Sequence, residues 1–214
     1  MIILVGIKHT LLLEEQLKKL IHDRHPDAIA VELDVFRYRW LTNQSTKEEI
    51  TTYFSDVPNI YKMISSFKRK SQKRSGVDRE WASGIILRIA KEIKAEVIPI
   101  DVDQLNLYRE IERNMSLAEK IRVFFSLFSE SFIPKKTMGE KEKDEEVFSE
   151  KFPTLKKYII DFRDDHISKE IQRHSKNYKN LMVVLGNAHL KGIYKNIKTL
   201  KPEIIDMDML KKII

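Results

Sequence analysis

Two short apolar runs, one near each end of the chain, constrain the fold most strongly. Residues 1–6 (MIILVG) and residues 181–186 (LMVVLG) are continuous apolar runs that end in glycine. A run of this length without polar alternation is typical of a strand that is buried on both faces, as in a parallel sheet covered by helices. Both ends of the chain are therefore predicted to contribute strands to a mostly parallel sheet.

The rest of the chain alternates between strand and helix patterns. We predict an α/β fold with a mostly parallel central sheet of about four to five strands, flanked by helices, in a single domain over residues 1–214. A helical excursion is expected at about 34–75 and an exposed loop at about 131–150. Further strands are expected at 28–31, 96–101 and 204–205, and helices at about 11–25, 78–95, 103–114, 116–130, 155–178 and 189–199.

Composition excludes several kinds of chemistry. The chain has no cysteine, so thiol nucleophiles and thiolate metal sites are ruled out, and a metal would have to be held by His, Asp and Glu. The 39 Lys and Arg residues exceed the 32 Asp and Glu residues, which slightly favours an anionic partner. The charged, cysteine-free composition resembles that of thermophilic proteins, and a homodimer would be compatible with that origin. The opening apolar run is too short for a signal peptide or a membrane span, so a cytoplasmic protein without a membrane segment is expected.

Both apolar runs continue into the same short motif, G-x-x-H. Gly6 is followed by His9, and Gly186 is followed by His189. Glycine permits backbone conformations and close approaches that other residues do not, so the chain can leave each strand sharply. In a parallel sheet both histidines would lie above the carboxyl edge, where open α/β folds place their ligands.

Two more predicted strands end in carboxylates, Glu32 and Asp101. Together with His9 and His189 they would form a donor set that suits a divalent ion such as Zn, Mn or Co, with open positions for water and substrate. Each residue also has a structural alternative. A carboxylate after a strand often caps a helix or interacts with its dipole, and a histidine there can simply hydrogen-bond the turn.

The order of these motifs resembles the TraB/PrgY family. That family includes the pheromone-shutdown proteins and is related to the Tiki metalloproteases and to the erythromycin-esterase and ChaN-like group. The resemblance extends from residue 1 to about residue 195. The segments that carry it are the first GxxH, PDAIAVELDVFR at 26–37, EVIPID at 96–101, the pair Arg163-Asp164, and VVLGNAHLKGI at 183–193.

The resemblance implies an α/β fold and, by analogy with the Tiki proteins, metal-dependent peptide cleavage. His9, His189 and Asp101 would hold the metal ion. Either Glu32 or Glu80, a glutamate at the start of a predicted helix, would take a proton from the attacking water. Glu80 has its own structural alternative, because a glutamate in the first turn of a helix is favoured by the helix dipole.

Three basic residues are assigned to substrate binding. Arg37 or Arg163 would orient the substrate, since the fork of a guanidinium suits a peptide carboxylate or a phosphate. The alternative for Arg163 is a structural salt bridge, with a partner from elsewhere because Asp164 and Asp165 are expected to face away on the helix. Lys8 lies within the first GxxH, where the family pattern has a small residue or Thr, and its ammonium would compete with a metal.

The sequence therefore favours a metal-dependent hydrolase that acts on a peptide or peptide-like signal. The alternative is a non-catalytic protein that binds and sequesters a peptide or a small anionic ligand at the same rim. The basic run at 68–74 is the best nucleic-acid feature, but it lacks aromatic partners and is more typical of a solvated loop, so nucleic acid is not the expected partner.

Overall fold

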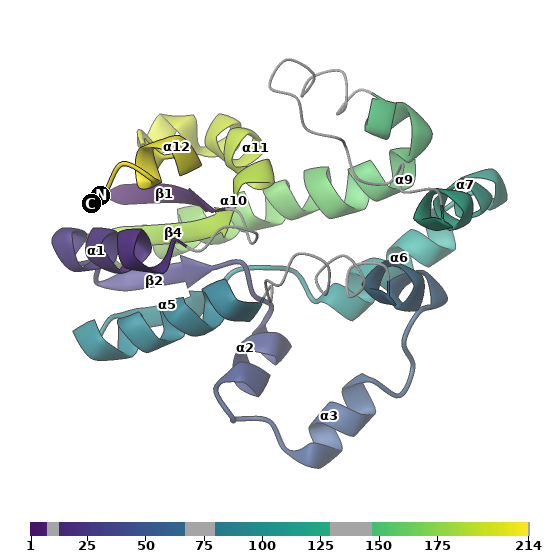
Figure 1. Ribbon diagram of the computed structural model, residues 1–214, viewed down its shortest axis with the longest axis horizontal. Helices are drawn as coiled ribbons and strands as arrows, with labels where there is room; N and C mark the ends of the chain where they lie inside the picture. The colour runs from purple at the N-terminus through teal and green to yellow at the C-terminus, as the bar shows by residue number, and fades with distance from the viewer. Residues whose placement is uncertain (8–12, 67–79, 129–146, 214) are drawn as a thin grey trace.

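The computed structural model describes residues 1–7, 13–66, 80–128 and 147–213 (Figure 1). Within these ranges five parallel strands form one sheet in the order β3-β2-β4-β1-β5. This arrangement confirms the predicted α/β fold with a parallel central sheet. The strands are β1 (Ile2–Ile7), β2 (Ala28–Val31), β3 (Glu96–Pro99), β4 (Leu181–Gly186) and β5 (Glu203–Ile205).

The strands from the two ends of the chain lie side by side in the sheet. β4 pairs with β1 on one side, with Ile7 opposite Gly186, and with β2 on the other, with Val31 opposite Val184. Because all three strands are parallel, their carboxyl ends lie next to one another at one edge of the sheet. We call this edge the carboxyl rim.

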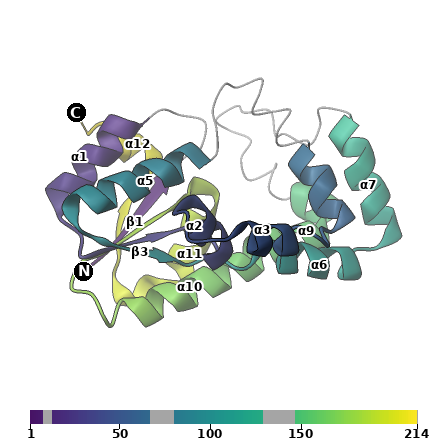
Figure 2. The same ribbon diagram turned by 90° about the horizontal axis from the view of Figure 1, so that it is seen from below.

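Helices cover both faces of the sheet (Figures 1 and 2). One face packs against α1 (Glu14–Arg24), α5 (Glu80–Ile93) and α12 (Met207–Leu210), and the other packs against α10 (Arg163–His174) and α11 (Asn187–Ile197). Successive residues of each strand point to opposite faces of the sheet and pack into the hydrophobic core on that face, so both faces of β1 are buried. This two-sided burial explains why β1 and β4 are continuous apolar runs.

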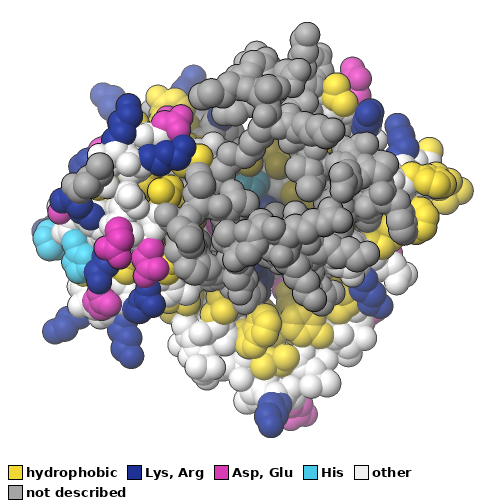
Figure 3. All heavy atoms as spheres, viewed as in Figure 1, with side chains coloured by type: hydrophobic (Ala, Val, Ile, Leu, Met, Phe, Trp, Pro, Cys, Tyr) yellow, Lys and Arg dark blue, Asp and Glu magenta, His cyan; other side chains and the backbone are white. Residues whose placement is uncertain are grey.

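A third hydrophobic cluster lies beyond the carboxyl rim (Figure 1). Its helices are α6 (Gln104–Asn114), α7 (Leu117–Phe128), α9 (Pro153–Leu155) and the helical residues 59–66. The outer face of α7 exposes apolar side chains, among them Leu117 and Phe125, at the right of Figure 3. None of the described helices is long and apolar enough to span a bilayer.

The described part of the helical excursion contains α2 (Val35–Leu41), α3 (Lys47–Tyr53) and the helix at 59–66. Asp34 caps α2, since its side chain accepts from the backbone N–H of Arg37 at 2.8 Å. The basic run at 68–74 lies outside the described residues. Most of the expected loop at 131–150 also lies outside them, and residues 147–151 are helical.

The predicted uniform helix over 155–178 is wrong in one respect. Residues Lys156–Phe162, directly after α9, form a π-helix, η1, and the α-helical hydrogen-bond pattern resumes at Arg163. π-helical turns are rare and are found most often at functional sites. The change of helical register therefore falls directly before Arg163 and Asp164, which are both buried.

Candidate active site

Arg163 lies at the centre of a buried group of charged side chains at the carboxyl rim. Its Nε and Nη2 donate to the two carboxylate oxygens of Asp101 at 2.9 and 2.8 Å. Nη2 also donates to Glu32 Oε1 at 2.6 Å, and Nη1 lies 3.2 Å from His189 Nε2. Burial alone would lower the pKa of Arg163, but the nearby carboxylates of Asp101 and Glu32 outweigh it and raise that pKa above its ordinary value. We call this group the rim cluster: Glu32, Asp101, Arg163, Asp164 and His189.

Glu32 lies directly after β2 and is mostly buried. Its Oε2 accepts from the backbone N–H of Gly186, at the end of β4, at 2.6 Å. Burial opposes ionisation of this carboxyl, but the charges of Arg163 and His189 and the Gly186 amide outweigh it and lower the pKa of Glu32 to about 2. Glu32 is therefore a carboxylate at physiological pH and a weak proton acceptor.

His189 is held by a carboxylate from the adjacent helix. Asp164 Oδ1, on α10, lies 2.6 Å from Nδ1 of His189, on α11, and both side chains are buried. When the imidazole is neutral, Nδ1–H donates to Asp164, and the lone pair of Nε2 faces Arg163. A histidine oriented in this way by a buried carboxylate is suited to take a proton through Nε2.

Gly192 is required for this contact between α10 and α11. A Cβ built at Gly192 would lie 1.9 Å from Asp164 Oδ2 and 3.0 Å from its Cγ. No side chain can occupy that space while the Asp164 carboxylate keeps its position. The glycine of the motif HLKGI is therefore explained by the close approach of Asp164, which is bound to His189.

Gly192→Ala should lower the free energy of unfolding by about 1.5–3 kcal/mol, because the added methyl displaces a buried, charged hydrogen-bond acceptor. The measurement is urea unfolding at pH 7. Gly84→Ala is the matched control, since nothing lies within 4 Å of a Cβ at Gly84 in α5. That control should be neutral or stabilise by up to about 1 kcal/mol, because alanine is the better helix former. Equal effects of the two changes would contradict the assignment of Gly192.

The structure accounts for glycine at the first of the two GxxH motifs but not, by backbone conformation, at the second. A Cβ at Gly6 would lie 2.8 Å from Asn187 Oδ1 and 3.0 Å from Leu190 Cδ2, so Gly6 permits the close approach of α11. Gly186 has φ −60° and ψ 133°, a conformation open to any residue. Of the two reasons expected for a glycine at this strand end, a special backbone conformation does not apply to Gly186, and a close approach stays a prediction there.

The described donor groups do not fit a divalent metal in this arrangement. Both oxygens of Asp101 accept from Arg163, and Nε2 of His189, the nitrogen a metal would use, faces the same guanidinium. A cation already lies where the ion would have to bind these donors. Among the residues the structure describes, no group of three or more His, Asp or Glu side chains is placed to hold a metal ion.

The structure does not place the other predicted site residues in the rim cluster. Lys8 and His9 are outside the described residues, and of Glu80 the structure describes only the backbone position at the start of α5. Arg37 lies on α2, where its backbone N–H donates to the capping Asp34. The structure therefore brings together Glu32, Asp101, Arg163 and His189 of the predicted set.

Asp164 is a member of the rim cluster to which the sequence analysis assigned no role. It was expected to face away from Arg163, and the ion-pair partners of Arg163 are indeed Asp101 and Glu32. What was not expected is that Asp164 is only 6% exposed and bonds His189. Its spacing carried the signal, because Asp164 precedes Ile167 by three residues and Ile171 by seven, and both isoleucines are buried on the same helix face. Asp165, one position on, is exposed and pairs with Lys169.

The low pKa of Glu32 predicts acid sensitivity. Its folded pKa of about 2 is below the ordinary 4.5, so its contribution to stability is complete above pH 4.5 and is lost as the pH falls toward 2. Over that interval the free energy of unfolding should fall by about 3 kcal/mol from this group alone. Urea unfolding at pH 5, 3 and 2 measures the loss. The Glu32→Gln variant should start less stable and lose less over the same interval; an unchanged pH slope would contradict the assignment.

The fold and the rim cluster define a parallel α/β protein whose sheet edge carries a buried histidine–carboxylate pair beside a guanidinium. No family model matches the chain. The chain is 27% identical over 202 residues to an uncharacterized protein, MJ1365, of Methanocaldococcus jannaschii, in an alignment that covers 87% of this chain and 50% of that protein. The chain thus spans about half the length of this relative. The resemblance to the TraB/PrgY family stays a prediction.

Proposed function

We propose that the protein is a hydrolase that cleaves a carbonyl compound, an ester or amide of peptide-like character, at the rim cluster. The observation that carries the proposal is the placement of His189 between Asp164, 2.6 Å from Nδ1, and Arg163, 3.2 Å from Nε2. A base oriented by a carboxylate and a fixed cation beside it are two components that acyl transfer to water requires.

In this mechanism His189 is the general base. The 3.2 Å contact between Nε2 and Nη1 of Arg163 opens to admit a water, and Nε2 takes the water proton as the water oxygen attacks the carbonyl carbon. The same imidazolium then returns the proton to the leaving nitrogen or oxygen. Asp164 fixes the tautomer and favours the imidazolium that forms.

Arg163 is placed to stabilise the negative charge that develops on the carbonyl oxygen. Four of its five N–H groups have partners among the described residues, namely Asp101 twice, Glu32 once and His189 once. The second N–H of Nη1 remains to donate to the substrate oxygen. Glu32 and Asp101 then act as positioning residues that fix the guanidinium plane, rather than as proton acceptors.

The charge of the rim cluster favours a neutral or cationic substrate over an anionic one. The rim cluster holds three carboxylates against one guanidinium: Glu32 and Asp101 contact Arg163, and Asp164 contacts His189. A small anion brought to this group would meet a net negative charge. Among the predicted partners, this balance favours the peptide over the small anionic ligand.

The experiment that tests the proposal is a hydrolysis screen of the full chain on p-nitrophenyl esters, aminoacyl esters and short peptides. Turnover by the wild type that falls at least about 100-fold in His189→Ala would support it, since general base catalysis contributes about 10²–10⁴ in rate. The control variant is His174→Ala, on the far end of α10, which should keep full activity. A wild-type protein that binds peptides without any turnover would support the sequestering alternative instead.

The predicted metal stays a prediction, because His9 is outside the described residues. It is tested by metal analysis of the untagged protein, grown with Mn, Co or Zn, beside the His9→Ala/His189→Ala variant. One ion per chain that is lost in this variant would support a metal site at the rim. Hydrolysis that is unchanged by chelators would support His189 as a base that needs no metal.

A further inference from the structure

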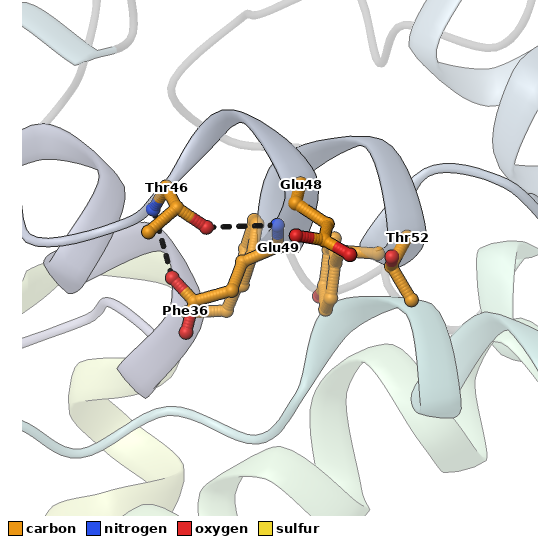
Figure 4. Close-up of a pocket in the computed structure, with 6 residues that line it drawn as sticks. Phe36, Thr46, Glu48, Glu49 and Thr52 are labelled. Carbon is orange, nitrogen blue, oxygen red and sulfur yellow. Dashed lines mark hydrogen bonds between the residues drawn. The ribbon is translucent and has the colours of Figure 1, made fainter.

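A cleft of about 480 Å³ lies between α2 and α3 (Figure 4). Its volume falls within the range of small-ligand pockets. The excursion that forms it begins two residues after Glu32, at the end of β2. The lining residues are Phe36, Thr46, Glu48, Glu49, Thr52 and Tyr53.

One wall of the cleft is aromatic. The rings of Phe36 and Tyr53 stack with centroids 3.6 Å apart and an angle of 8° between their planes. Phe54 meets both rings edge-on, at 6.0 and 5.2 Å, and Trp40 meets Phe54 in the same way at 6.1 Å. This packing holds the two lining rings in fixed positions, so the wall is preformed.

The two glutamates of the cleft differ in their contacts. Glu49 forms a capping box with Thr46 and an ion pair with Arg39 at 2.8 Å, so its charge is compensated. Glu48 is exposed and makes no hydrogen bond or ion pair with any described residue. An uncompensated carboxylate beside aromatic faces is the pattern that binds an ammonium or guanidinium group.

One lining residue of the cleft, Tyr53, lies near residues that follow strands β2 and β3. The hydroxyl of Tyr53 is buried and lies near the backbone of Leu105, at the start of α6. Burial, together with the charges of Asp34 and Asp103, raises its pKa above the ordinary value. Asp34 follows Glu32 by two residues and Asp103 follows Asp101 by two, so Tyr53 is within electrostatic reach of the two segments that also carry Glu32 and Asp101.

We propose that this cleft is a subsite for a cationic side chain, lysine or arginine, of the substrate. The inference rests on the proposed function: a peptide whose carbonyl lies at the rim cluster would place a neighbouring basic side chain between α2 and α3. Glu48 supplies the opposite charge, and the rings of Phe36 and Tyr53 contact the cation and its methylene groups. The substrate class is therefore a peptide with a basic residue near the cleaved bond.

The test is binding, measured without turnover, of N-acetyl-arginine amide by the full chain. Its neutral isostere, N-acetyl-citrulline amide, is the comparison ligand. In NMR titrations the backbone amides of residues 46–53 should shift with the arginine compound, and its dissociation constant should be at least about 5-fold lower than that of the citrulline compound, which is about 1 kcal/mol. Equal affinity for the two compounds would overturn the subsite.

The matched variants are Glu48→Gln and Glu15→Gln. Each removes one exposed carboxylate from the second position of a helix, α3 and α1 respectively, so both change the net charge and the helix dipole in the same way. Glu48→Gln should weaken arginine amide binding about 3–10-fold, a typical cost for one exposed charge on a cation site, and Glu15→Gln should leave it unchanged. Equal losses in both variants would overturn the assignment of Glu48.

The His189→Ala variant separates this inference from the proposed hydrolysis. It should bind N-acetyl-arginine amide as the wild type does, because His189 does not line the cleft. Retained binding together with an absence of hydrolysis in the wild type would uphold the subsite while contradicting the proposed function. Loss of binding in His189→Ala would place the cation at the rim cluster and overturn the subsite.

Discussion

Replacing Arg163 with methionine should lower the free energy of unfolding by about 3–5 kcal/mol at pH 7. Methionine fills a similar volume but leaves the buried carboxylates of Asp101 and Glu32 without their cation. Removal of one partner from a buried ionic group is costly because the remaining charges have already lost their water. Urea unfolding followed by circular dichroism measures the change.

Arg173→Met is the matched control for this prediction. Arg173 lies on the same helix, its side chain is 65% exposed, and it pairs with Glu170. An exposed pair of this kind contributes about 0–1 kcal/mol, so the control should stay close to the wild type. The loss in Arg163→Met should also shrink as the pH falls below 4.5, where Glu32 without its cation can take up a proton. A loss that is no larger than that of Arg173→Met would contradict the central role of Arg163.

Asp164→Asn should reduce kcat/KM about 10²–10⁴-fold for a substrate found in the hydrolysis screen, with the fold retained. An asparagine keeps the shape of the side chain, but it offers His189 a neutral amide instead of a carboxylate. If the amide nitrogen faces the ring, Nδ1 becomes the acceptor and Nε2 carries the proton, so the base has the wrong tautomer. The reduction should appear in kcat, because Asp164 acts through His189 and does not touch the substrate.

Asp165→Asn is the control for this second prediction. Asp165 is the next residue on α10, is exposed, and pairs with Lys169, so its change should leave the kinetics unaltered. The His189→Ala/Asp164→Asn double variant should be no less active than His189→Ala alone, since the two residues act as one unit. Additive losses would show that Asp164 acts independently of His189.

The strands of the sheet, and the polar residues that follow them at the carboxyl rim, were predictable from the local hydrophobic pattern of the sequence. Continuous apolar runs identified β1, β2 and β4 as buried strands, and strands buried on both faces belong almost always to a parallel sheet covered by helices. Since parallel strands share a carboxyl edge, the residues just after them had to gather there. Glu32, Asp101 and His189 were therefore found from the sequence, although their spacing in the chain exceeds 150 residues.

Chain topology alone did not specify which of these groups touch one another. The sequence pattern assigned Asp101 and His189 to a metal, whereas the structure places the Arg163 guanidinium between them. This contact depends on the distance and orientation of α10 relative to the sheet, and such orientations come from packing across the whole core. The hydrophobic periodicity of a single helix does not determine its distance and orientation relative to the sheet.

The sequence by itself determined the strands, most of the helices and the rim at which the polar residues collect. Only the tertiary structure decided that Asp164 holds His189, that Gly192 makes room for it, and that a cleft lies between α2 and α3. The physical reason is that hydrophobic pattern is a property of neighbouring residues, whereas a side-chain contact between two helices depends on their relative position to within an ångström or so.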